Sequence, residues 1–340
     1  MGIARPCRAD YDGFMITAAR LEKFGPAAES LVVSQIPARP PRAGEVTVSM
    51  RFAPINPADL NVIEGKYGEL PGLPATIGNE GAGCISLLGE GVSGLAVGDV
   101  VLPMTFGTWA GEMTVPAASV VPVPNGVNIE QASMLTVNPA TAWRLLHDFV
   151  DLAPGDWIVQ NAANSGVGRS VIQIAKALGW RTLNVVRRPE LVDELLAAGA
   201  DRVVLEDCDL RAEVVSLCAG QRPKLGFNAV GGASALNVAN ALAHSGTLVT
   251  FGAMGRQPLK IPNGLLIFSD LSFRGFWLKR WRERAAANEI RSTYAALGEL
   301  LQRGVLHSPV HETFPLTRLH DAVTAAARDQ RNGKILLDLA

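Results

Sequence analysis

The hydrophobic and polar positions of this chain follow two different patterns, and the pattern changes near residue 130. Between residues 25 and 125, short runs of apolar and β-branched residues alternate with segments rich in Gly and Pro. Runs of this length between turn residues predict short strands in an irregular, largely antiparallel β-barrel. The predicted strands lie at residues 30–37, 45–55, 81–89, 99–104 and 112–124.

From residue 128 onward, apolar residues at helical spacing alternate with short, uninterrupted apolar runs. This alternation predicts βαβ units and therefore a doubly wound parallel sheet. We expect the first helix of this part to begin near Asn128 or Ile129. The predicted strands are 156–162, 182–186, 201–205, 225–230 and 247–252, and the main helices between them are 169–179, 190–200 and 234–246.

The last part of the chain departs from the parallel-sheet pattern. Residues 308–339 predict a strand, an amphipathic helix and a final strand that follows an Asn-Gly turn. These elements suit a return to the first domain, so that the second domain is an insertion in the first. We predict a β-barrel domain of residues 1–129 and 305–340, and a parallel-sheet domain of residues 130–304.

Composition narrows the classes of function. The 340 residues include 31 Lys and Arg against 32 Asp and Glu, which gives a formal net charge of −1. This balance provides no bulk attraction to nucleic acid or to an anionic membrane. No apolar run reaches the roughly 18 to 20 residues of a membrane helix. The hydrophobic fraction of 48% excludes extensive disorder, so we expect a compact protein with neither nucleic-acid nor membrane partners.

The cysteines give a first indication of compartment. They lie far apart in the sequence and form no C-x-x-C pair, which argues against a disulfide framework and a structural zinc site. The N-terminal residues lack the apolar core of a secretory signal. These observations predict a cytoplasmic protein. The four cysteines are Cys7, Cys84, Cys208 and Cys218.

The most informative chemical motif is the turn between the strand at 156–162 and the helix at 169–179. Glycines in such a turn let backbone N–H groups and the positive end of the helix approach a pyrophosphate. A tight turn that binds nothing would have a similar sequence, but the βαβ setting favours a dinucleotide site. The residues of the predicted phosphate loop are Asn164, Ser165, Gly166, Val167 and Gly168.

The next strand, residues 182–186, ends in Arg187 and Arg188. NAD-selective sites commonly place Asp or Glu here to accept from the ribose hydroxyls, whereas arginines suit a 2′-phosphate. The pair therefore favours NADPH, and the alternative is two solvated surface arginines. Farther along, residues 247–255 form a strand followed by a Gly-rich bend, where the nicotinamide half of the cofactor is expected.

Residues 55–83, INPADLNVIEGKYGELPGLPATIGNEGAG, are followed in order by PGD, NSGVG, FGAM and GFW. This succession resembles the medium-chain dehydrogenase/reductase superfamily. Zinc-dependent members of that superfamily carry Cys at or near the position of Asn56, and His in place of Asn79 before Glu80. Both ligands are absent, so we predict no metal and do not expect reversible alcohol oxidation.

Within the superfamily, the chain resembles the enoyl thioester reductases of mitochondrial fatty acid synthesis, which reduce trans-2-enoyl-CoA or enoyl-acyl carrier protein. Motifs such as GTWAGE, NPATAWRLL, SFRGFWL and NGKILL extend the resemblance over roughly residues 15–337. It implies an α/β protein with a GroES-like barrel and a Rossmann cofactor domain, and it places the catalytic tyrosine at Tyr67. The cofactor contacts that it implies are Asn138, Asn164, Ser165, Gly166, Val167, Gly168, Arg187, Arg188, Phe251, Gly252, Ala253, Met254, Phe276, Trp277, Leu278 and Lys334.

The resemblance implies NADPH-dependent reduction of the 2,3 double bond, with hydride added at the β-carbon and Tyr67 as the donor. A tyrosine suits this role because its ordinary pKa near 10 keeps it protonated at neutral pH. An NADPH-dependent quinone or enone reductase and a non-enzymatic NADPH-binding sensor are the alternatives.

The resemblance also implies a homodimer formed by pairing of sheet edges, for which residues 264–278 could supply the edge strand. The basic segment 278–284 is a candidate contact for the phosphates of coenzyme A or acyl carrier protein, or else a solvated basic face.

Overall fold

The computed structural model describes residues 13–328 and 331–340, and the chain divides into two compact units. Unit 1 comprises Met1–Val137 and Tyr294–Ala340, and unit 2 comprises Asn138–Thr293, so unit 2 is inserted in unit 1. The domain limits predicted from the sequence, after residues 129 and 304, differ from the limits of these units. Cys7 lies outside the described residues.

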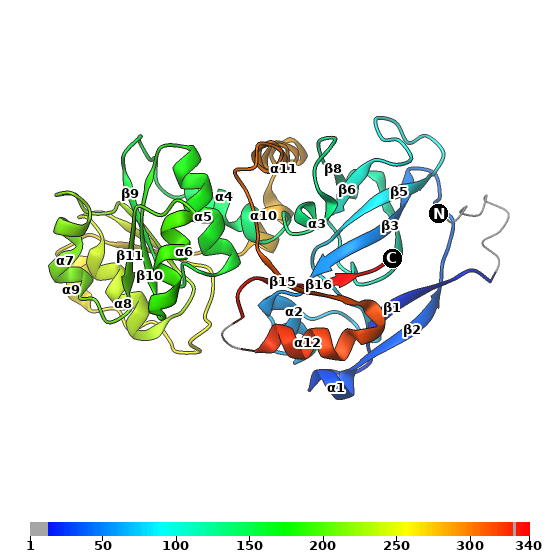
Figure 1. Ribbon diagram of the computed structural model, residues 1–340, viewed down its shortest axis with the longest axis horizontal. Helices are drawn as coiled ribbons and strands as arrows, with labels where there is room; N and C mark the ends of the chain where they lie inside the picture. Colours follow the sequence, from blue (N-terminus) through cyan, green and yellow to red (C-terminus); the bar gives the residue numbers. More distant parts are fainter. Residues whose placement is uncertain (1–12, 329–330) are drawn as a thin grey trace. The chain divides into compact units, whose positions relative to one another are not determined.

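Unit 1 is built mainly from antiparallel strands in two sheets, seen in Figure 1. One sheet has the order β2-β1-β4, and the larger has the order β15-β16-β3-β5-β6-β8, with β7 also paired to β3. Only the pair β15–β16 of these sheets is parallel among the described residues. The elements are β1 (Met15–Leu21), α1 (Ala27–Ser30), β2 (Leu31–Pro37), β3 (Glu45–Pro54), α2 (Pro57–Ile63), β4 (Ala75–Thr76), β5 (Ala82–Leu88), β6 (Val100–Pro103), β7 (Glu112–Pro116), β8 (Val120–Pro122), α3 (Ile129–Ala132), β15 (Val310–Pro315), α12 (Leu319–Ala327) and β16 (Lys334–Asp338).

Strand β1 was not predicted from the sequence. Its buried positions are Ala18, Ala19 and Leu21, and alanine carries little strand preference, so the apolar pattern is weak. The helix start near Asn128 is confirmed, because its side chain caps α3 by accepting from the backbone N–H of Glu130 at 2.8 Å.

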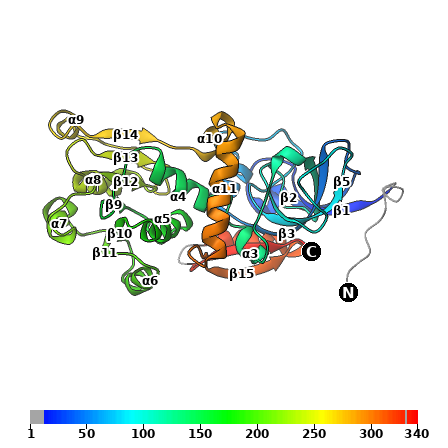
Figure 2. The same ribbon diagram turned by 90° about the horizontal axis from the view of Figure 1, so that it is seen from above.

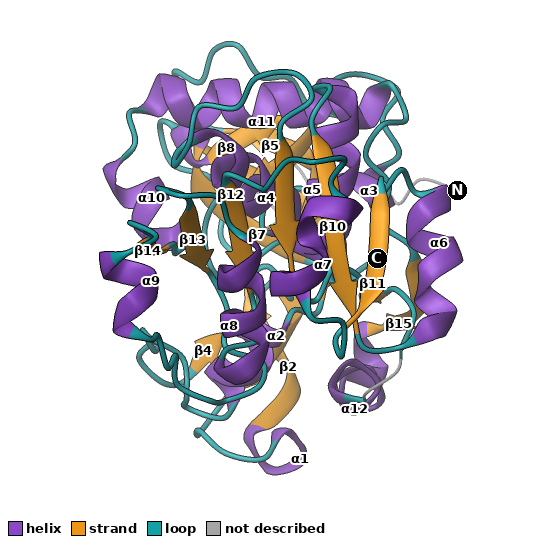
Figure 3. Cartoon of the chain, turned by 90° about the vertical axis from the view of Figure 1, so that its left-hand side faces the viewer, coloured by secondary structure: helices purple, strands orange, loops and turns teal. Residues whose placement is uncertain are grey.

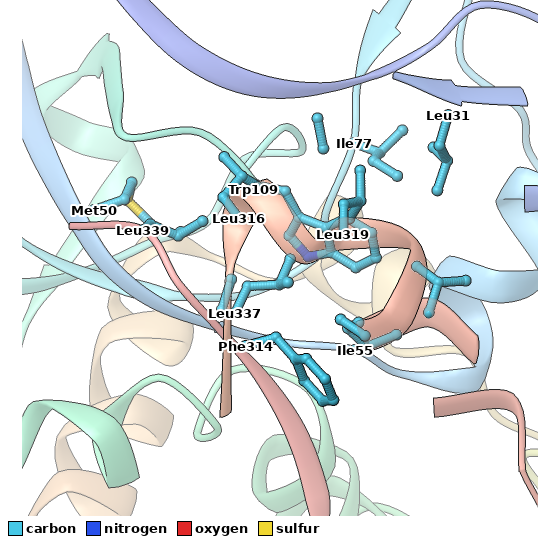
Figure 4. Packing of buried hydrophobic residues seen from close by; sticks show 14 of the residues in the cluster. Leu31, Met50, Ile55, Ile77, Trp109, Phe314, Leu316, Leu319, Leu337 and Leu339 are labelled. Carbon is cyan, nitrogen blue, oxygen red and sulfur yellow. The ribbon is translucent and has the colours of Figure 1, made fainter. Parts of the chain in front are cut away.

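The core of unit 1 joins residues from both parts of the chain. Figure 4 shows Trp109 among Leu316, Leu319 and Ile77, with Leu337 of β16 nearby. All five side chains are almost fully buried. Burial of a large apolar side chain stabilises the fold by roughly 1.5 to 3 kcal/mol. This core therefore holds the C-terminal helix and strand on the barrel.

Unit 2 is a six-stranded, fully parallel sheet of order β11-β10-β9-β12-β13-β14. This is the strand order of the Rossmann fold, so the predicted doubly wound sheet is confirmed. Figure 2 shows α4 and α5 on one face and α7 and α8 on the other, and Figure 3 shows the strands and helices in separate colours. The elements are α4 (Asn138–His147), β9 (Trp157–Gln160), α5 (Gly166–Ala177), β10 (Arg181–Val186), α6 (Val192–Ala197), β11 (Arg202–Leu205), α7 (Leu210–Leu217), β12 (Leu225–Asn228), α8 (Gly232–Ala241), β13 (Thr247–Thr250), α9 (Asn263–Ile267), β14 (Ser272–Gly275), α10 (Leu278–Arg284) and α11 (Ala287–Gln302), the last of which continues into unit 1.

The edge of this sheet differs from the expectation of one long strand over residues 264–278. The segment begins as the short helix α9, and only Ser272–Gly275 form a strand. Asp270 has a φ of 51°, in the left-handed region, which separates the two elements. In the part of the chain that the structure describes, no helix has both the length and the apolar character needed to span a membrane.

Candidate functional site

The phosphate loop predicted from the sequence opens helix α5 in unit 2. Ser165 caps this helix, since its side chain accepts from the backbone N–H of Gly168 at 3.1 Å. A Cβ at Gly168 would lie only 2.5 Å from the carbonyl oxygen of Ala163, so a side chain does not fit there. The loop thus brings the helix N-terminus close to the end of β9, as an anion site requires.

The loop lies at the point where the strand order of the sheet reverses, between β9 and β12. Two buried amides tie these strand ends together. Asn161 Nδ2 donates to Asn228 Oδ1 at 2.9 Å, and the Asn161 carbonyl oxygen Oδ1 accepts from the backbone N–H of Ala229 at 2.8 Å. Open α/β sheets bind their ligands at this point of the sheet. The amides therefore hold in place the two strand ends at which a ligand is expected.

A second amide pair connects the loop to the neighbouring strand β10. Gln160 Nε2 lies 2.9 Å from the carbonyl oxygen of Gly168 and 2.8 Å from Asn184 Oδ1. The sequence analysis missed these buried amides, although each stands out as a polar residue within or at the end of an apolar run. Unpaired buried amides are costly, so these paired ones restrain the loop and strand together.

Strand β10 ends beside the two arginines that the sequence analysis assigned to a 2′-phosphate. Arg187 is exposed, and Arg188 is half-buried, with its guanidinium 3.4 Å from the Glu190 carboxylate. Both follow the buried Val186 directly. The chain therefore provides two cations at the carboxyl end of the strand next to the phosphate loop.

The other predicted cofactor contacts of unit 2 gather at the same edge of the sheet. Backbone N–H groups tie them to the strands, because Phe251 donates to Asn228 at 3.0 Å and Phe276 donates to Thr250 at 3.0 Å. The residues Phe251, Gly252, Ala253 and Met254 follow β13, Phe276 and Trp277 follow β14, and the buried Leu278 begins α10. Asn138, at the start of α4, lies beside Gly166, and Val167 is buried in α5.

The predicted catalytic Tyr67 and the predicted cofactor contact Lys334 belong to unit 1. Tyr67 follows α2 in a bend, is half-buried and packs against the core of the unit. The turn before it requires glycine at Gly65, which has a φ of 72° and would place a Cβ 2.9 Å from Phe24.

A buried polar cluster surrounds the start of α2 in unit 1. Asp59 Oδ2 accepts from the backbone N–H of Asn56 at 2.7 Å. Asp59 Oδ1 accepts from the backbone N–H and the Nδ2 of Asn79, at 3.1 and 2.7 Å. Burial raises the pKa of Asp59 to about 6. The sequence analysis gave Asp59 no role, although the Asn-Pro-x-Asp spacing is typical of a helix start.

Two further charges complete the cluster. The buried Glu80 carboxylate accepts from Asn56 Nδ2 at 2.6 Å and, through Oε2, from the backbone N–H of Val137 at 2.8 Å. Burial raises the pKa of Glu80, while the nearby Lys334 ammonium acts against that rise. Lys334 donates to Asn56 Oδ1, and burial lowers the pKa of Lys334 to about 8. One amide thus bridges a buried cation and a buried anion.

Two protein families match separate parts of this chain. The model of the alcohol dehydrogenase GroES-like domain matches residues 42–125, and that of the zinc-binding dehydrogenase matches residues 166–293. The human mitochondrial enoyl-[acyl-carrier-protein] reductase is 42% identical over 305 residues, which cover 88% of this chain and 82% of the human protein. The chain belongs to the enoyl-[acyl-carrier-protein] reductase family.

Solved structures agree with this family. The complex of Etr1p with NADP and crotonyl-CoA matches with a TM-score of 0.87 and 29% identity, over 96% of this chain and 100% of that one. A quinone oxidoreductase from Pseudomonas syringae matches with a TM-score of 0.83 and 26% identity, over 95% and 100% of the two chains. The expected α/β architecture of a GroES-like domain and a Rossmann domain is confirmed.

The comparisons correct one prediction. The sequence analysis placed the protein in the cytoplasm, whereas the enoyl reductase relatives from human, rat, mouse and frog are all named as mitochondrial. The cysteine spacing and the absence of a secretory pattern cannot distinguish these two compartments, because neither feature separates one intracellular compartment from another.

One of the two matched families is named zinc-binding dehydrogenase, but the side chains of this polar cluster do not fit a zinc ion. Zinc prefers thiolate, imidazole and carboxylate ligands, whereas Asn56 and Asn79 offer amides that are already hydrogen-bonded to Glu80 and Asp59. The Lys334 ammonium on Asn56 Oδ1 would also repel a cation. Within residues 13–328 and 331–340, no group of three or more His, Cys, Asp and Glu side chains is arranged to hold a metal.

Proposed function

We propose that this protein is an NADPH-dependent reductase of trans-2-enoyl thioesters. The observation that carries this conclusion is the 42% identity with an enoyl-[acyl-carrier-protein] reductase over 88% of the chain. The phosphate loop at the strand-order reversal and the arginine pair after β10 support the choice of cofactor. The mitochondrial names of the relatives support a mitochondrial location.

We assign the cofactor to unit 2 and the donor to unit 1. The N-terminus of α5 would hold the pyrophosphate through backbone N–H groups, and Gly168 lets this helix start lie close against the backbone of Ala163. Arg187 and Arg188 provide the charge that selects a 2′-phosphate. NADPH, when bound, supplies the hydride that adds to the β-carbon of the enoyl thioester. The site residues predicted from the sequence are retained in this assignment.

Tyr67 performs the proton chemistry. Its phenol O–H donates to the thioester oxygen as negative charge develops there. The α-carbon then takes the proton of the Tyr67 hydroxyl, which solvent replaces, so that the double bond gains one hydride and one proton in total. Because no metal takes part in this assignment, the hydroxyl of Tyr67 is the group that stabilises the developing charge.

The test is NADPH oxidation with trans-2-hexenoyl-CoA, for the parent, Tyr67→Phe and Tyr294→Phe. We expect Tyr67→Phe to lower kcat/KM by about tenfold or more, since about 1.4 kcal/mol of transition-state stabilisation corresponds to tenfold. Tyr294→Phe removes the same hydroxyl from a buried site, where it donates to the Thr136 carbonyl oxygen at 3.0 Å, and should keep the parental rate. An inactive parent that still binds NADPH would contradict the proposed reaction. An active parent with an equally active Tyr67→Phe would contradict the role of Tyr67.

The same assay tests the alternative of a quinone or enone reductase, which matches to two solved quinone reductase structures favour. A quinone can take its proton from solvent, so an enzyme of that kind should reduce a quinone faster than an enoyl thioester and tolerate Tyr67→Phe. Binding of NADPH without reduction of either acceptor would favour the alternative of a non-enzymatic NADPH-binding sensor.

The substrate carrier is coenzyme A or acyl carrier protein, and α10 is the segment that we assign to its phosphates. Lys279 and Arg280 are exposed on this helix, although Glu283 lies 4.0 and 2.9 Å from their charged groups. Replacing both cations with glutamate should raise KM for the acyl-CoA with little change in kcat. An unchanged KM would make α10 an ordinary solvated face.

We also propose a homodimer formed along strand β14. This strand is the edge of the sheet, and the residues before it include Ile267 and Phe268, which are 68% and 80% exposed. Exposed apolar side chains beside an open strand edge favour pairing with another chain. A solved structure of a relative from Candida tropicalis is an Etr1p/Etr2p heterodimer. Light scattering should give the dimer mass for the parent and the monomer mass for the double variant Ile267→Asp, Phe268→Asp. A dimeric double variant would refute this interface.

A further inference from the structure

The buried ammonium of Lys334 has more hydrogen-bond donors than the described chain gives it acceptors. Lys334 is 8% exposed at the start of β16, and an ammonium carries three N–H donors. Among residues 13–328 and 331–340, the acceptor that hydrogen-bonds it is Asn56 Oδ1. Two N–H groups of a buried cation are therefore left to find an acceptor outside these residues, and a buried charge without such partners is costly.

Asn56 is held in one orientation from both sides. Its backbone N–H donates to Asp59 Oδ2 at 2.7 Å, and its Nδ2 donates to Glu80 Oε1 at 2.6 Å. The side-chain oxygen then has to face the ammonium of Lys334. A flipped amide would bring its NH₂ group to the ammonium and its oxygen to the carboxylate, so both contacts would become repulsive.

The charges around Lys334 come from several elements. Glu80, before β5, and Asp59, on α2, favour the protonated amine, whereas Arg331, just before β16, opposes it. Strand β15 pairs with Lys334 at Val310, and the neighbouring His311 and Glu312 on β15 are exposed. Glu80 is the stronger of the two supporting anions.

We propose that Asn56 and Glu80 are positioning residues, which keep the Lys334 ammonium charged and direct its two remaining N–H groups to an oxygen of the bound dinucleotide. This inference rests on the proposed function, because it takes Lys334 as a contact of NADPH. The polar cluster of unit 1 does not fit zinc, and in this proposal the Lys334 ammonium is the cation that it holds. Asn56 and Glu80 act through Lys334 and need not touch the substrate.

The inference predicts how NADPH affinity depends on pH. The affinity of the parent should fall as the pH rises through the pKa of Lys334 near 8, because the neutral amine loses its attraction for the ligand oxygen. Glu80→Gln removes the anion that favours the ammonium, so the midpoint should move about 1 pH unit lower. Glu112→Gln, the same change at another buried glutamate of unit 1, should leave the midpoint at the parental value.

The measurement is the NADPH dissociation constant by nucleotide fluorescence across this pH range, with melting curves to verify folding. Asn56→Leu should also lower the midpoint, and Lys334→Gln should remove the pH dependence, so either keeps the test decisive if Glu80→Gln does not fold. A pH-independent parent, or the same midpoint in the parent and the Glu80 and Asn56 variants, would overturn the inference. A parent that binds no NADPH at any pH would overturn the proposed function as well. Binding with the expected shifts but no enoyl reduction would overturn the proposed function alone.

Discussion

Replacement of Gly168 by alanine should impair NADPH binding through a backbone clash. The new Cβ would lie 2.5 Å from the Ala163 carbonyl oxygen and 2.7 Å from its carbonyl carbon and Cα. Ordinary contacts begin near 3.4 Å, so α5 or the end of β9 must move by about 1 Å. Overpacking of this kind costs typically about 1 to 3 kcal/mol. A misplacement of about 1 Å can also lower the reaction rate by about 100-fold.

We therefore expect Gly168→Ala to raise the NADPH dissociation constant by about tenfold or more, which corresponds to about 1.4 kcal/mol. Fluorescence titration measures this constant, and urea unfolding measures stability separately. The matched control is Gly264→Ala, another helical glycine of unit 2, where the nearest atom to the new Cβ is 3.7 Å away. Parental affinity in a Gly168→Ala protein that has lost stability would refute the assignment of this loop to the pyrophosphate, whereas parental values of both would show that the loop relaxes.

Three further outcomes follow from the geometry. The double variant Arg187→Ser, Arg188→Ser should raise the dissociation constant of NADPH by about 10- to 100-fold, since hydrogen bonds to charged groups are worth about 1.5 to 3 kcal/mol. The dissociation constant of NADH should hardly change, and equal losses of affinity for both nucleotides would contradict selection of the 2′-phosphate. Gly78→Ala should destabilise unit 1 by about 2 kcal/mol or more in urea unfolding, because Gly78 has a φ of 113° and a Cβ there would lie 2.3 Å from the Trp109 ring. Parental stability of this variant would show that the turn relaxes. Because the pKa of Asp59 is raised to about 6, the folded protein binds a proton that the unfolded chain has already released, so stability should fall as the pH rises from about 4 to about 6, and Asp59→Asn should flatten that fall relative to the parent.

The parallel sheet was predictable because its inner strands β9, β10 and β12 are short, mostly apolar and buried. Periodicity and turn residues located β9, β10 and β12 closely, and the Asn128 cap marked the helix start correctly. The short edge was not predictable in this way. Helix α9 contains Leu265, Leu266 and Ile267, whereas β14 is the mostly exposed Ser-Phe-Arg-Gly segment, and Asp270, with its positive φ, lies between the two.

The phosphate loop could be recognised locally, because its residues are consecutive and its glycines have a local steric role. The polar cluster of unit 1 could not be recognised in this way. Asn56 and Lys334 are separated by 278 positions, and only the pairing of β16 with β3 brings them together. Asp59 and Glu80 likewise acquire their shifted pKa values from burial, which the sequence does not report directly.

Asn56 differs from a zinc ligand in more than its failure to bind the metal. An asparagine amide carries both a donor and an acceptor and no charge, so Asn56 can join the Glu80 carboxylate to the Lys334 ammonium without adding a second anion. An aspartate at the same position would place a new charge beside Glu80, and an apolar residue would leave two buried ions without their common partner. The amide at position 56 and the lysine at position 334 are thus physically interdependent. This dependence explains how the chain can keep both the Glu80 carboxylate and the Lys334 ammonium buried at one site.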